Sequence, residues 1–223
     1  MCRLDVKKYE TIADLETLVL EFRNYFIVKR MFDVACSLII LILLAPGLII
    51  VSLFVKLDGT NGTVFFTQER MGINGTVFKM YKFRSMVPNA ENILGKIEHL
   101  NESEGNMFKI KEDPRLTKIG KVLRAYSIDE IPQFINVLKG DMSIIGPRPC
   151  LLTEYANFTD YDKSRLVVKP GMTGLWQVSG RSSLSFTEMI ELDLQYIQSL
   201  SLKMELYIFV RTFLVVLKKE NAC

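Results

Sequence analysis

The stretch VACSLIILILLAPGLIIVSLFV, residues 34–55, carries no charged side chain over about 22 positions. An apolar run of this length is long enough to cross a bilayer as a helix. It is longer than the apolar region of a secretory signal, begins further from the N-terminus, and has no small-residue cleavage site. Three interpretations remain open: a re-entrant segment that enters and leaves one leaflet, a spanning helix, and a buried core helix.

Two features of this stretch favour the re-entrant interpretation. Pro46-Gly47 lies near its midpoint, where proline removes a backbone hydrogen bond and glycine permits bending. Basic residues flank both ends, so the positive-inside rule places both ends in the cytoplasm. These residues are Lys29, Arg30, Lys56, Lys79, Lys82 and Arg84. Each half contains about 11 residues, or about 16 Å of helix, enough to dip into one leaflet. We expect a re-entrant membrane helix over 29–57, bent at Ala45-Pro46.

The segments at the two ends of the chain have amphipathic patterns. Residues 10–28 place apolar side chains at near-helical spacing among acids, which predicts an amphipathic N-terminal helix within 1–28 or a helix packed on the domain. Residues 200–220 are apolar and aromatic with interspersed basic residues. This pattern is typical of an interfacial helix within 200–223, and a terminal core helix fits it equally.

The middle of the chain, residues 58–199, is expected to form the catalytic part of one structural domain. Apolar and polar residues alternate around two Asn-Gly pairs in 60–86, which predicts short antiparallel strands. A helical pattern follows at 89–100, then an irregular basic stretch over 113–130, then a helix over 131–138 ended by Lys139-Gly140. The predicted fold class is α+β, mostly helical and monotopic, with a small antiparallel hairpin sheet.

The composition excludes several classes of protein. Of the 223 residues, 49% are hydrophobic and 24% are charged, which excludes a disordered chain. The formal net charge of +3 is too small for a nucleic-acid-binding protein, so no nucleic acid is expected as a partner. The four cysteines have no CxxC spacing and His99 is the single histidine. Reduced thiols are therefore expected, without a zinc site or a disulfide framework.

Asp129 and Glu130 stand where the helix over 131–138 begins. Pro132 is tolerated only within the first turn of a helix, which makes Asp129 a natural N-cap with Glu130 in the first turn. A capping box between Ser127 and Glu130 is the competing arrangement. Two acids at a helix start need no function, because they complement the helix dipole.

Basic residues on both sides of this acidic pair favour a function. Pro147-Arg148-Pro149 follows the pair, and four basic residues precede it: Arg115, Lys118, Lys121 and Arg124. Such a set can hold phosphates through bidentate arginine contacts, while the acids bind Mg²⁺ or attack phosphorus. Each basic residue could equally be a solvated surface charge.

Six motifs run in order through the chain: VKRMFDVACS, FTQERMG, YKFRSM, DPRLTKIGKVLR, SIDEIPQFINVLKGDMSIIGPRP and KPGMTGLWQVSGR. In sequence and spacing they resemble the bacterial sugar transferase family of monotopic phosphoglycosyl transferases, from about residue 28 to 219. The resemblance implies an enzyme that moves a sugar-1-phosphate from a UDP-sugar to undecaprenyl phosphate and releases UMP. Such an enzyme starts surface glycan synthesis at the cytoplasmic face of the bacterial inner membrane.

The resemblance also implies roles for particular residues. The catalytic acidic dyad of the family corresponds to Asp129 and Glu130, with Asp129 forming a covalent phosphosugar and Mg²⁺ required at the pair. The membrane bend of the family corresponds to Pro46, and its Pro-Arg-Pro element to Arg148. The candidate phosphate and substrate contacts are Arg148, Arg124, Arg115, Lys118, Lys82, Arg84 and Gln177. Gln177 and Trp176 could line a sugar or uracil pocket, although a lone tryptophan is more often core.

The sequence departs from the family in two places. Many members have serine before the bending proline, where this chain has Ala45, so no hydroxyl is available there to bond a freed carbonyl. Only about 28 residues precede the catalytic part, as expected of a minimal form. The segment GLWQVSGRS resembles members that use UDP-glucose or UDP-galactose. A homodimer is a further possibility.

Two other functions fit parts of the same pattern. A membrane-tethered scaffold would use its basic elements to bind anionic lipid headgroups, and the dyad would merely cap a helix. A glycosyltransferase that moves the sugar alone would release UDP instead of UMP. The released nucleotide therefore discriminates between the last function and phosphosugar transfer.

Overall fold

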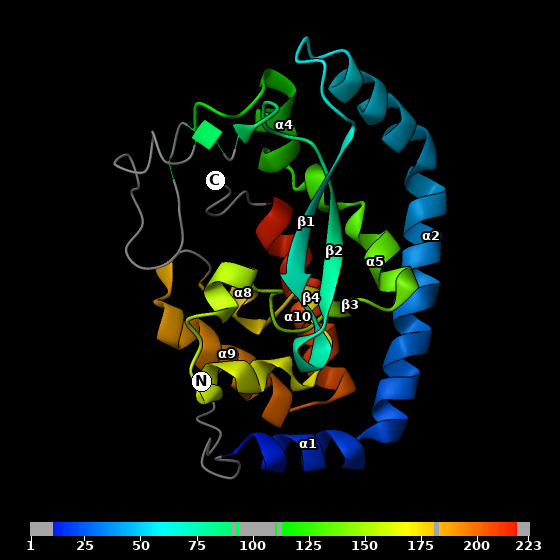
Figure 1. Ribbon diagram of the computed structural model, residues 1–223. Coiled ribbons are helices and arrows are strands. Elements are labelled where there is room, and N and C mark those ends of the chain that lie inside the picture. The colour runs from blue at the N-terminus through cyan, green and yellow to red at the C-terminus, as the bar shows by residue number, and fades with distance from the viewer. Residues whose placement is uncertain (1–10, 91, 94–109, 111–112, 181–182, 218–223) are drawn as a thin grey trace.

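A computed structural model describes residues 11–90, 92–93, 110, 113–180 and 183–217 of the chain. One long helix, α2 (Arg23–Lys56), runs along one flank of a mixed domain made of short helices and two small sheets. Figure 1 shows α2 curving around this domain, with α1 (Ile12–Glu21) at its start and the hairpin β1–β2 after its end. The predicted α+β class, mostly helical with a small antiparallel sheet, is confirmed.

The apolar half of α2 is exposed. In its most apolar 18-residue window only 6% of residues are buried, and the helix is long and apolar enough to cross a membrane. The buried core helix is therefore the wrong interpretation of residues 34–55. At the expected bend, Ala45-Pro46, α2 continues as one helix through Pro46. A helix can accommodate an internal proline by bending, and α2 is visibly curved.

The first part of α2 is fastened to the domain by polar contacts. Arg30 donates to the carbonyl oxygens of Val137 (2.5 Å) and Leu138 (2.9 Å). The buried carboxylate of Asp33 accepts from Ser143 Oγ at 2.8 Å and from the Ile144 amide at 3.1 Å. Residues 30–33 therefore cannot leave the domain without exposing unpaired charge.

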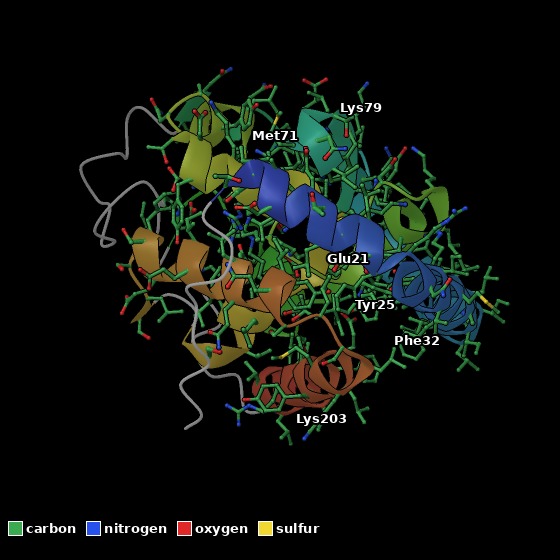
Figure 2. The ribbon with its side chains drawn as sticks, turned by 90° about the horizontal axis from the view of Figure 1, so that it is seen from below. Glu21, Tyr25, Phe32, Met71, Lys79 and Lys203 are labelled. Atoms are coloured by element: carbon green, nitrogen blue, oxygen red, sulfur yellow. The ribbon has the colours of Figure 1, made fainter. Side chains whose placement is uncertain are left out.

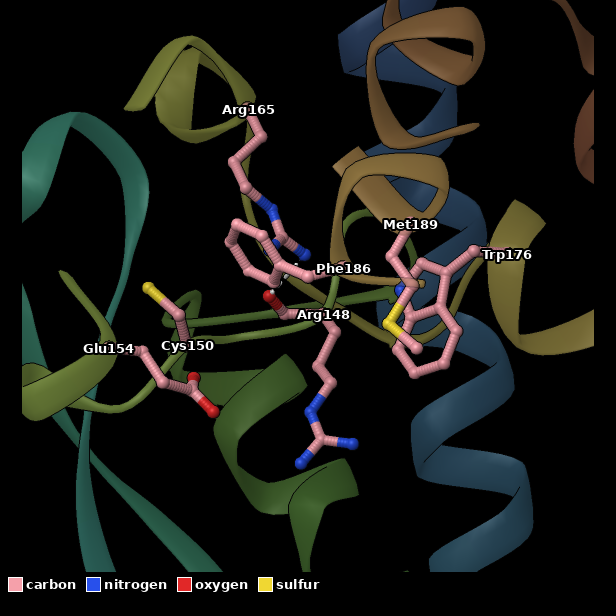
Figure 3. Close-up of a pocket in the computed structure, with 7 residues that line it drawn as sticks. All are labelled: Arg148, Cys150, Glu154, Arg165, Trp176, Phe186 and Met189. Atoms are coloured by element: carbon pink, nitrogen blue, oxygen red, sulfur yellow. Dashed lines mark hydrogen bonds between the residues drawn. The ribbon is translucent and has the colours of Figure 1, made fainter. Parts of the chain in front are cut away.

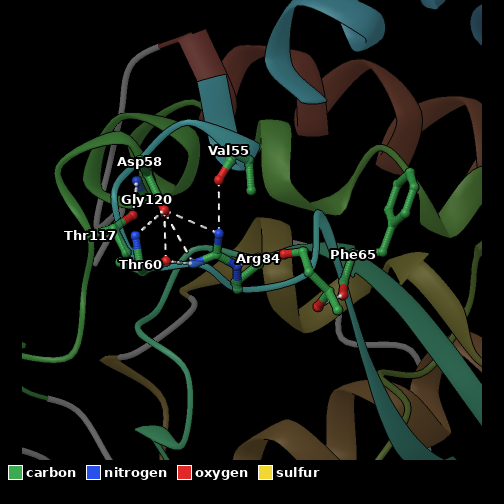
Figure 4. A network of polar contacts seen from close by, with 8 residues as sticks. Val55, Asp58, Thr60, Phe65, Arg84, Thr117 and Gly120 are labelled. Atoms are coloured by element: carbon green, nitrogen blue, oxygen red, sulfur yellow. Dashed lines mark hydrogen bonds and ion pairs between the residues drawn. The ribbon is translucent and has the colours of Figure 1, made fainter. Parts of the chain in front are cut away.

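The end of α2 is fastened to the same domain by Arg84, as Figure 4 shows. This buried side chain donates to Val55 O at 2.8 Å and to Thr63 O at 2.5 Å, and it bonds Thr60 Oγ1. It also forms an ion pair with Asp58 at 3.0 Å. Arg84 thus joins β2 to the loop that leaves the helix, so both ends of α2 are anchored on one body.

The predicted hairpin is confirmed. Strands β1 (Phe65–Met71) and β2 (Val77–Phe83) pair antiparallel around the 3₁₀ turn η1 (Ile73–Gly75). Asn74 within the turn has a positive φ of 52°, which asparagine tolerates better than most residues. The register places Phe66 opposite Lys82, and Lys82 Nζ reaches Glu130 Oε1 at 2.8 Å.

The basic stretch after Asp113 is not irregular as predicted, because Lys118–Ala125 forms helix α4. Thr117 caps it by accepting from the Gly120 amide at 2.9 Å. Gly120 suggests a helix breaker in the sequence, yet a Cβ there would lie 1.8 Å from the Ser85 carbonyl oxygen. Gly120 therefore allows α4 to pack closely against the backbone of Ser85, which follows β2. Most of the helix expected over 89–100 lies outside the described residues.

The segment after α4 builds the centre of the domain. The predicted helix over 131–138 is present as α5 (Gln133–Lys139), and Gly140 ends it with a φ of 90°. Strands β3 (Ser143–Ile145) and β4 (Gly171–Thr173) then pair in parallel, forming a second sheet that the sequence pattern did not predict. A Cβ on Gly171 would lie 2.1 Å from the Gly146 amide nitrogen, so the strand ends pack without side chains between them.

Helices after β3 surround this sheet. They are α6 (Leu152–Tyr155), α7 (Asp160–Lys163), η4 (Ser164–Val167), α8 (Leu175–Ser179), α9 (Phe186–Gln198) and α10 (Leu202–Leu217). Figure 2 shows α10 beside the first part of α2, where Lys29 and Glu205 form a buried ion pair at 2.5 Å. Ile208 of α10 is fully buried while Leu206 is 64% exposed, so α10 has both a core face and an apolar outer face.

The N-terminal helix packs on the domain. Leu15 and Leu18 of α1 are 2% and 5% exposed and belong to the main core. Helix α1 ends at Glu21 and α2 begins at Arg23, so the predicted single helix over 10–28 is divided between the two. Of its two interpretations, the packed helix describes α1.

Candidate active site

Asp129 and Glu130 lie in the 3₁₀ turn η3 (Ile128–Glu130), between α4 and α5. The expectation that Asp129 caps the next helix is wrong, because α5 begins at Gln133 after Pro132. The competing capping box is also wrong, because Ser127 is left-handed with a φ of 55° and makes no side-chain cap. The acids therefore lie in the turn η3 and not at the N-terminus of α5.

Burial controls the protonation of Asp129. This side chain is buried, and desolvation raises the pKa of Asp129 to about 6, against the opposing charges of Lys82 and Arg124. The charge of Glu130 raises this pKa further. The expected stabilisation of the carboxylate by a helix dipole is absent, yet a pKa of about 6 leaves Asp129 mostly ionised at neutral pH.

Glu130 is partly open to solvent and is paired with a cation. Its side chain is 41% exposed, and its Oε1 accepts from Lys82 Nζ at 2.8 Å. Desolvation acts to raise the pKa of Glu130, but the charges of Lys82, Arg148 and Arg124 outweigh it and hold the pKa below its ordinary value. Glu130 is therefore the more acidic member of the dyad.

The structure brings three of the predicted basic residues to the dyad. Lys82 comes from β2, Arg124 from α4 and Arg148 from the Pro-Arg-Pro element, and the charges of all three act on Glu130. Arg124 also donates to Ser85 Oγ at 3.0 Å. Three cations from separate elements around two carboxylates can hold a diphosphate and compensate its charge.

Arg148 lies at the edge of a small pocket, which Figure 3 shows. Its guanidinium carbon is 5.9 Å from the centre of the Trp176 ring, a cation–π distance. The pocket is lined by Arg148, Cys150, Glu154, Arg165, Trp176, Phe186 and Met189. Trp176 is buried, as expected of core, but its face supports an arginine next to the dyad.

The contacts of the other four predicted residues differ from those of the dyad cations. Arg84 is committed to the end of α2, and Arg115 forms a buried ion pair with Asp113 at 2.6 Å. Lys118 is exposed at the start of α4. Gln177 donates to Met172 O at 3.3 Å. Structural roles therefore describe Arg84 and Arg115 better than phosphate binding does.

Asn136 is a positioning residue that the sequence analysis missed. It is fully buried in α5, where its Oδ1 accepts from the Tyr81 amide at 2.9 Å and its Nδ2 donates to Lys79 O at 2.7 Å. These two bonds fix β2 against α5 and thereby place Lys82 beside Glu130. An asparagine within the apolar run FINVL was the available signal, because buried amides require partners.

The dyad fits a magnesium ion in its donor chemistry. Mg²⁺ is commonly bound by one or two carboxylates together with substrate phosphates and water. Asp129 and Glu130 offer two carboxylates, one buried and one partly exposed. Among the described residues no three His, Cys, Asp or Glu side chains form a metal cluster. Asp129 and Glu130 would therefore hold Mg²⁺ together with oxygens of substrate and water.

Fold and site together define an α+β protein with a membrane-type helix and an acidic pair among three cations. Comparison with known proteins gives the family: the bacterial sugar transferase family model matches residues 24–219. The chain belongs to that family.

Individual relatives agree with this assignment. The chain is 44% identical over 89% of its length to the galactosyl transferase CpsE of Streptococcus agalactiae. It is 39% identical over 90% of its length to the undecaprenyl-phosphate galactose phosphotransferase of Salmonella typhimurium. These matches span 44% and 42% of the two relatives. The exopolysaccharide production protein ExoY of Sinorhizobium fredii is 39% identical, over 82% of this chain and 83% of ExoY.

Proposed function

We propose that this protein transfers a sugar-1-phosphate from a UDP-sugar to undecaprenyl phosphate and releases UMP. The observation that carries the proposal is the Asp129–Glu130 pair, ringed by Lys82, Arg124 and Arg148 beside an exposed apolar helix. The relative named undecaprenyl-phosphate galactose phosphotransferase supports the lipid acceptor. The two relatives named for galactose transfer, from Streptococcus agalactiae and Salmonella typhimurium, support UDP-galactose as the first donor to test.

The proposed reaction has two displacements at one phosphorus. A carboxylate oxygen of Asp129 attacks the β-phosphorus of the UDP-sugar, and the bond from this phosphorus to the bridging oxygen breaks. That oxygen leaves with UMP. An oxygen of the lipid phosphate then bonds to the same phosphorus, and the Asp129 oxygen–phosphorus bond breaks. The carboxylate is regenerated, and covalent catalysis thus divides one transfer between water and membrane into two steps.

The surrounding residues have separate proposed tasks. Arg148 and Arg124 bind the diphosphate, while Lys82 holds Glu130 by the 2.8 Å ion pair. The Trp176 face keeps the Arg148 guanidinium near the dyad. When bound at Asp129 and Glu130, Mg²⁺ would neutralise diphosphate charge and stabilise the leaving phosphate. These positive charges offset the repulsion between the two acids and their anionic substrate.

The way α2 is anchored supports a re-entrant arrangement in the membrane. Arg30 and Asp33 near its start and Val55 at its end all bond to one domain. If α2 spanned the bilayer, the domain bonded along it would lie at the level of the hydrocarbon core, which is about 30 Å thick. The polar domain would then have to enter the lipid. We therefore place both ends of α2 on the cytoplasmic side, with the exposed apolar stretch in one leaflet.

Cysteine labelling tests this placement. In an active background without native cysteines, Asn24→Cys before the apolar stretch and Thr63→Cys after it should both resist an impermeant maleimide in intact cells. Both should react after permeabilisation, because both positions are exposed and the proposal places them on the cytoplasmic side. Lys121→Cys, exposed on α4, reports the side on which the domain lies. Labelling of position 24 in intact cells, with 63 and 121 protected, would establish a spanning helix instead.

The released nucleotide tests the transfer itself. Purified protein in vesicles with undecaprenyl phosphate should convert UDP-galactose or another UDP-sugar into UMP and a lipid-linked phosphosugar. Chromatography of the nucleotides and mass spectrometry of the lipid give both products. Release of UDP would indicate transfer of the sugar alone. No release from any UDP-sugar would favour a lipid-binding scaffold.

A further inference from the structure

The Pro147-Arg148-Pro149 element has every backbone carbonyl held by a donor. Pro147 O accepts from the Gly171 amide at 2.8 Å, and Cys150 O accepts from the Met71 amide at 3.0 Å. Between them, Arg148 O accepts from Arg165 Nη2 at 3.1 Å and Pro149 O from Arg70 Nη1 at 3.0 Å. Four consecutive carbonyls are therefore fixed, two of them by buried arginines.

The arginine that holds Arg148 is itself held by one buried acid. Arg165 is 5% exposed and Asp193 of α9 is fully buried, and the two form an ion pair. Burial raises the pKa of Asp193 to about 6, against the opposing charges of Arg165 and Arg148. In the described part of the chain, the Nε of Arg165 has no hydrogen-bond partner. This pair is therefore incompletely satisfied inside the domain.

The stability of the fold does not by itself explain the buried Arg165–Asp193 pair. Buried ion pairs often stabilise a fold no more than apolar residues of similar volume would, because both charges must leave water. The surrounding region already contains other cations, since burial and the charge of Arg148 lower the pKa of Arg70 to about 10. A role in the site explains an arrangement that packing alone does not.

We propose that the Arg165–Asp193 pair is a positioning device for Arg148. Arg165 holds the backbone of Arg148, as the dashed line in Figure 3 shows, and Asp193 holds Arg165. The side chain of Arg148 is thereby directed over the Trp176 ring and toward Glu130. The inference rests on the proposed function, in which Arg148 binds the diphosphate of the donor.

A double-mutant cycle tests the device. Arg165→Met combined with Asp193→Leu removes both charges, so neither is left unpaired in the interior. The changed protein should fold with a thermal midpoint near that of the wild type. Its kcat/KM for the UDP-sugar should fall by about 10- to 100-fold, the typical effect of misplacing a binding group by about 1 Å. In an Arg148→Ala background the same two changes should alter kcat/KM less than about twofold, because the side chain that the pair positions is absent.

A second buried ion pair supplies the matched control. Lys29→Met with Glu205→Gln removes the pair between α2 and α10, which does not touch Arg148. Any loss of activity in this control should be the same with and without Arg148, as expected for independent sites. A loss from Arg165→Met and Asp193→Leu that persists fully in the Arg148→Ala background would overturn the inference, as would undiminished activity.

A measurement without turnover separates this inference from the proposed function. In detergent-solubilised protein labelled on arginine, the Nε–H resonance of Arg148 is assigned by its loss in Arg148→Ala. Its heteronuclear NOE should show an ordered side chain in the wild type and a mobile one after Arg165→Met and Asp193→Leu. An Arg148 that stays ordered would refute the positioning role. A wild type that releases no UMP, with the NOE result as expected, would refute only the proposed reaction.

Discussion

Asp129→Asn is expected to abolish phosphosugar transfer while leaving a folded, membrane-bound protein. The amide keeps the shape of the side chain but cannot attack phosphorus, so the chemical step loses its nucleophile. Loss of one general acid or base typically costs about 10²- to 10⁴-fold, and loss of the nucleophile should exceed this range. Release of UMP and formation of the lipid product, measured together in vesicles, should both fall to background.

The covalent step can be observed directly. Wild-type protein given UDP-sugar without lipid should gain one phosphosugar on the peptide that contains Asp129, and Asp129→Asn should gain none. Steady-state kinetics with both substrates should be ping-pong. Because burial raises the pKa of Asp129 to about 6, kcat/KM for the UDP-sugar should fall as the pH decreases through that value and level off above about pH 7.

Two results would reject this mechanism. Intersecting initial-rate lines together with the absence of an adduct would mean that the lipid phosphate attacks the UDP-sugar directly. Retained activity in Asp129→Asn would remove Asp129 from the reaction altogether. Glu69→Gln, an exposed acid on β1, serves as the control for the loss of one carboxylate, and it should keep full activity.

The elements that could be predicted from the sequence are those with a local signal. The hairpin at β1 and β2 follows from alternation around turn residues, and the end of α5 follows from Gly140. The uncharged run identified α2 as a membrane-type helix. In each case the residues that determine the element lie within a few positions of one another, so a short stretch of sequence is enough to predict it.

The elements that were missed depend on contacts between distant residues. Gly120 lies inside α4 because the Ser85 backbone leaves no space for a side chain, and no local pattern contains that contact. The parallel pairing of β3 with β4 joins Ser143 to Gly171, too far apart for a turn signal. The anchoring of both ends of α2 to one domain also depends on such contacts.

In the candidate site, too, some residues could be predicted from the sequence and others could not. The resemblance identified Asp129, Glu130 and Arg148, but sequence could not separate the basic residues that reach them from those used elsewhere. Arg84 and Lys82 are two positions apart on the same hairpin, yet Arg84 holds the end of α2 and Lys82 pairs with Glu130. Residues two apart in a regular strand share a face, but Arg84 lies just beyond the end of β2 and meets other partners.

Removal of divalent metal is expected to stop the reaction, and Glu130 is the residue on which this effect should depend. The diphosphate of the donor must approach two carboxylates, and Lys82 already compensates the charge of Glu130 at 2.8 Å. A further cation is then needed to offset the remaining repulsion, and two acids with a diphosphate are a donor set that Mg²⁺ favours. Excess EDTA should abolish UMP release, and added Mg²⁺ should restore it.

Glu130→Gln separates this requirement from a general loss of activity. The amide keeps an oxygen donor but loses the charge, so the Mg²⁺ concentration for half-maximal rate should rise by about 10-fold or more, with a lower maximal rate. Glu69→Gln, which removes an acid opposite Lys79 on the hairpin, should leave that concentration unchanged. Full turnover in excess EDTA would exclude a metal at the dyad. An unchanged Mg²⁺ requirement in Glu130→Gln would exclude Glu130 as a ligand of the metal.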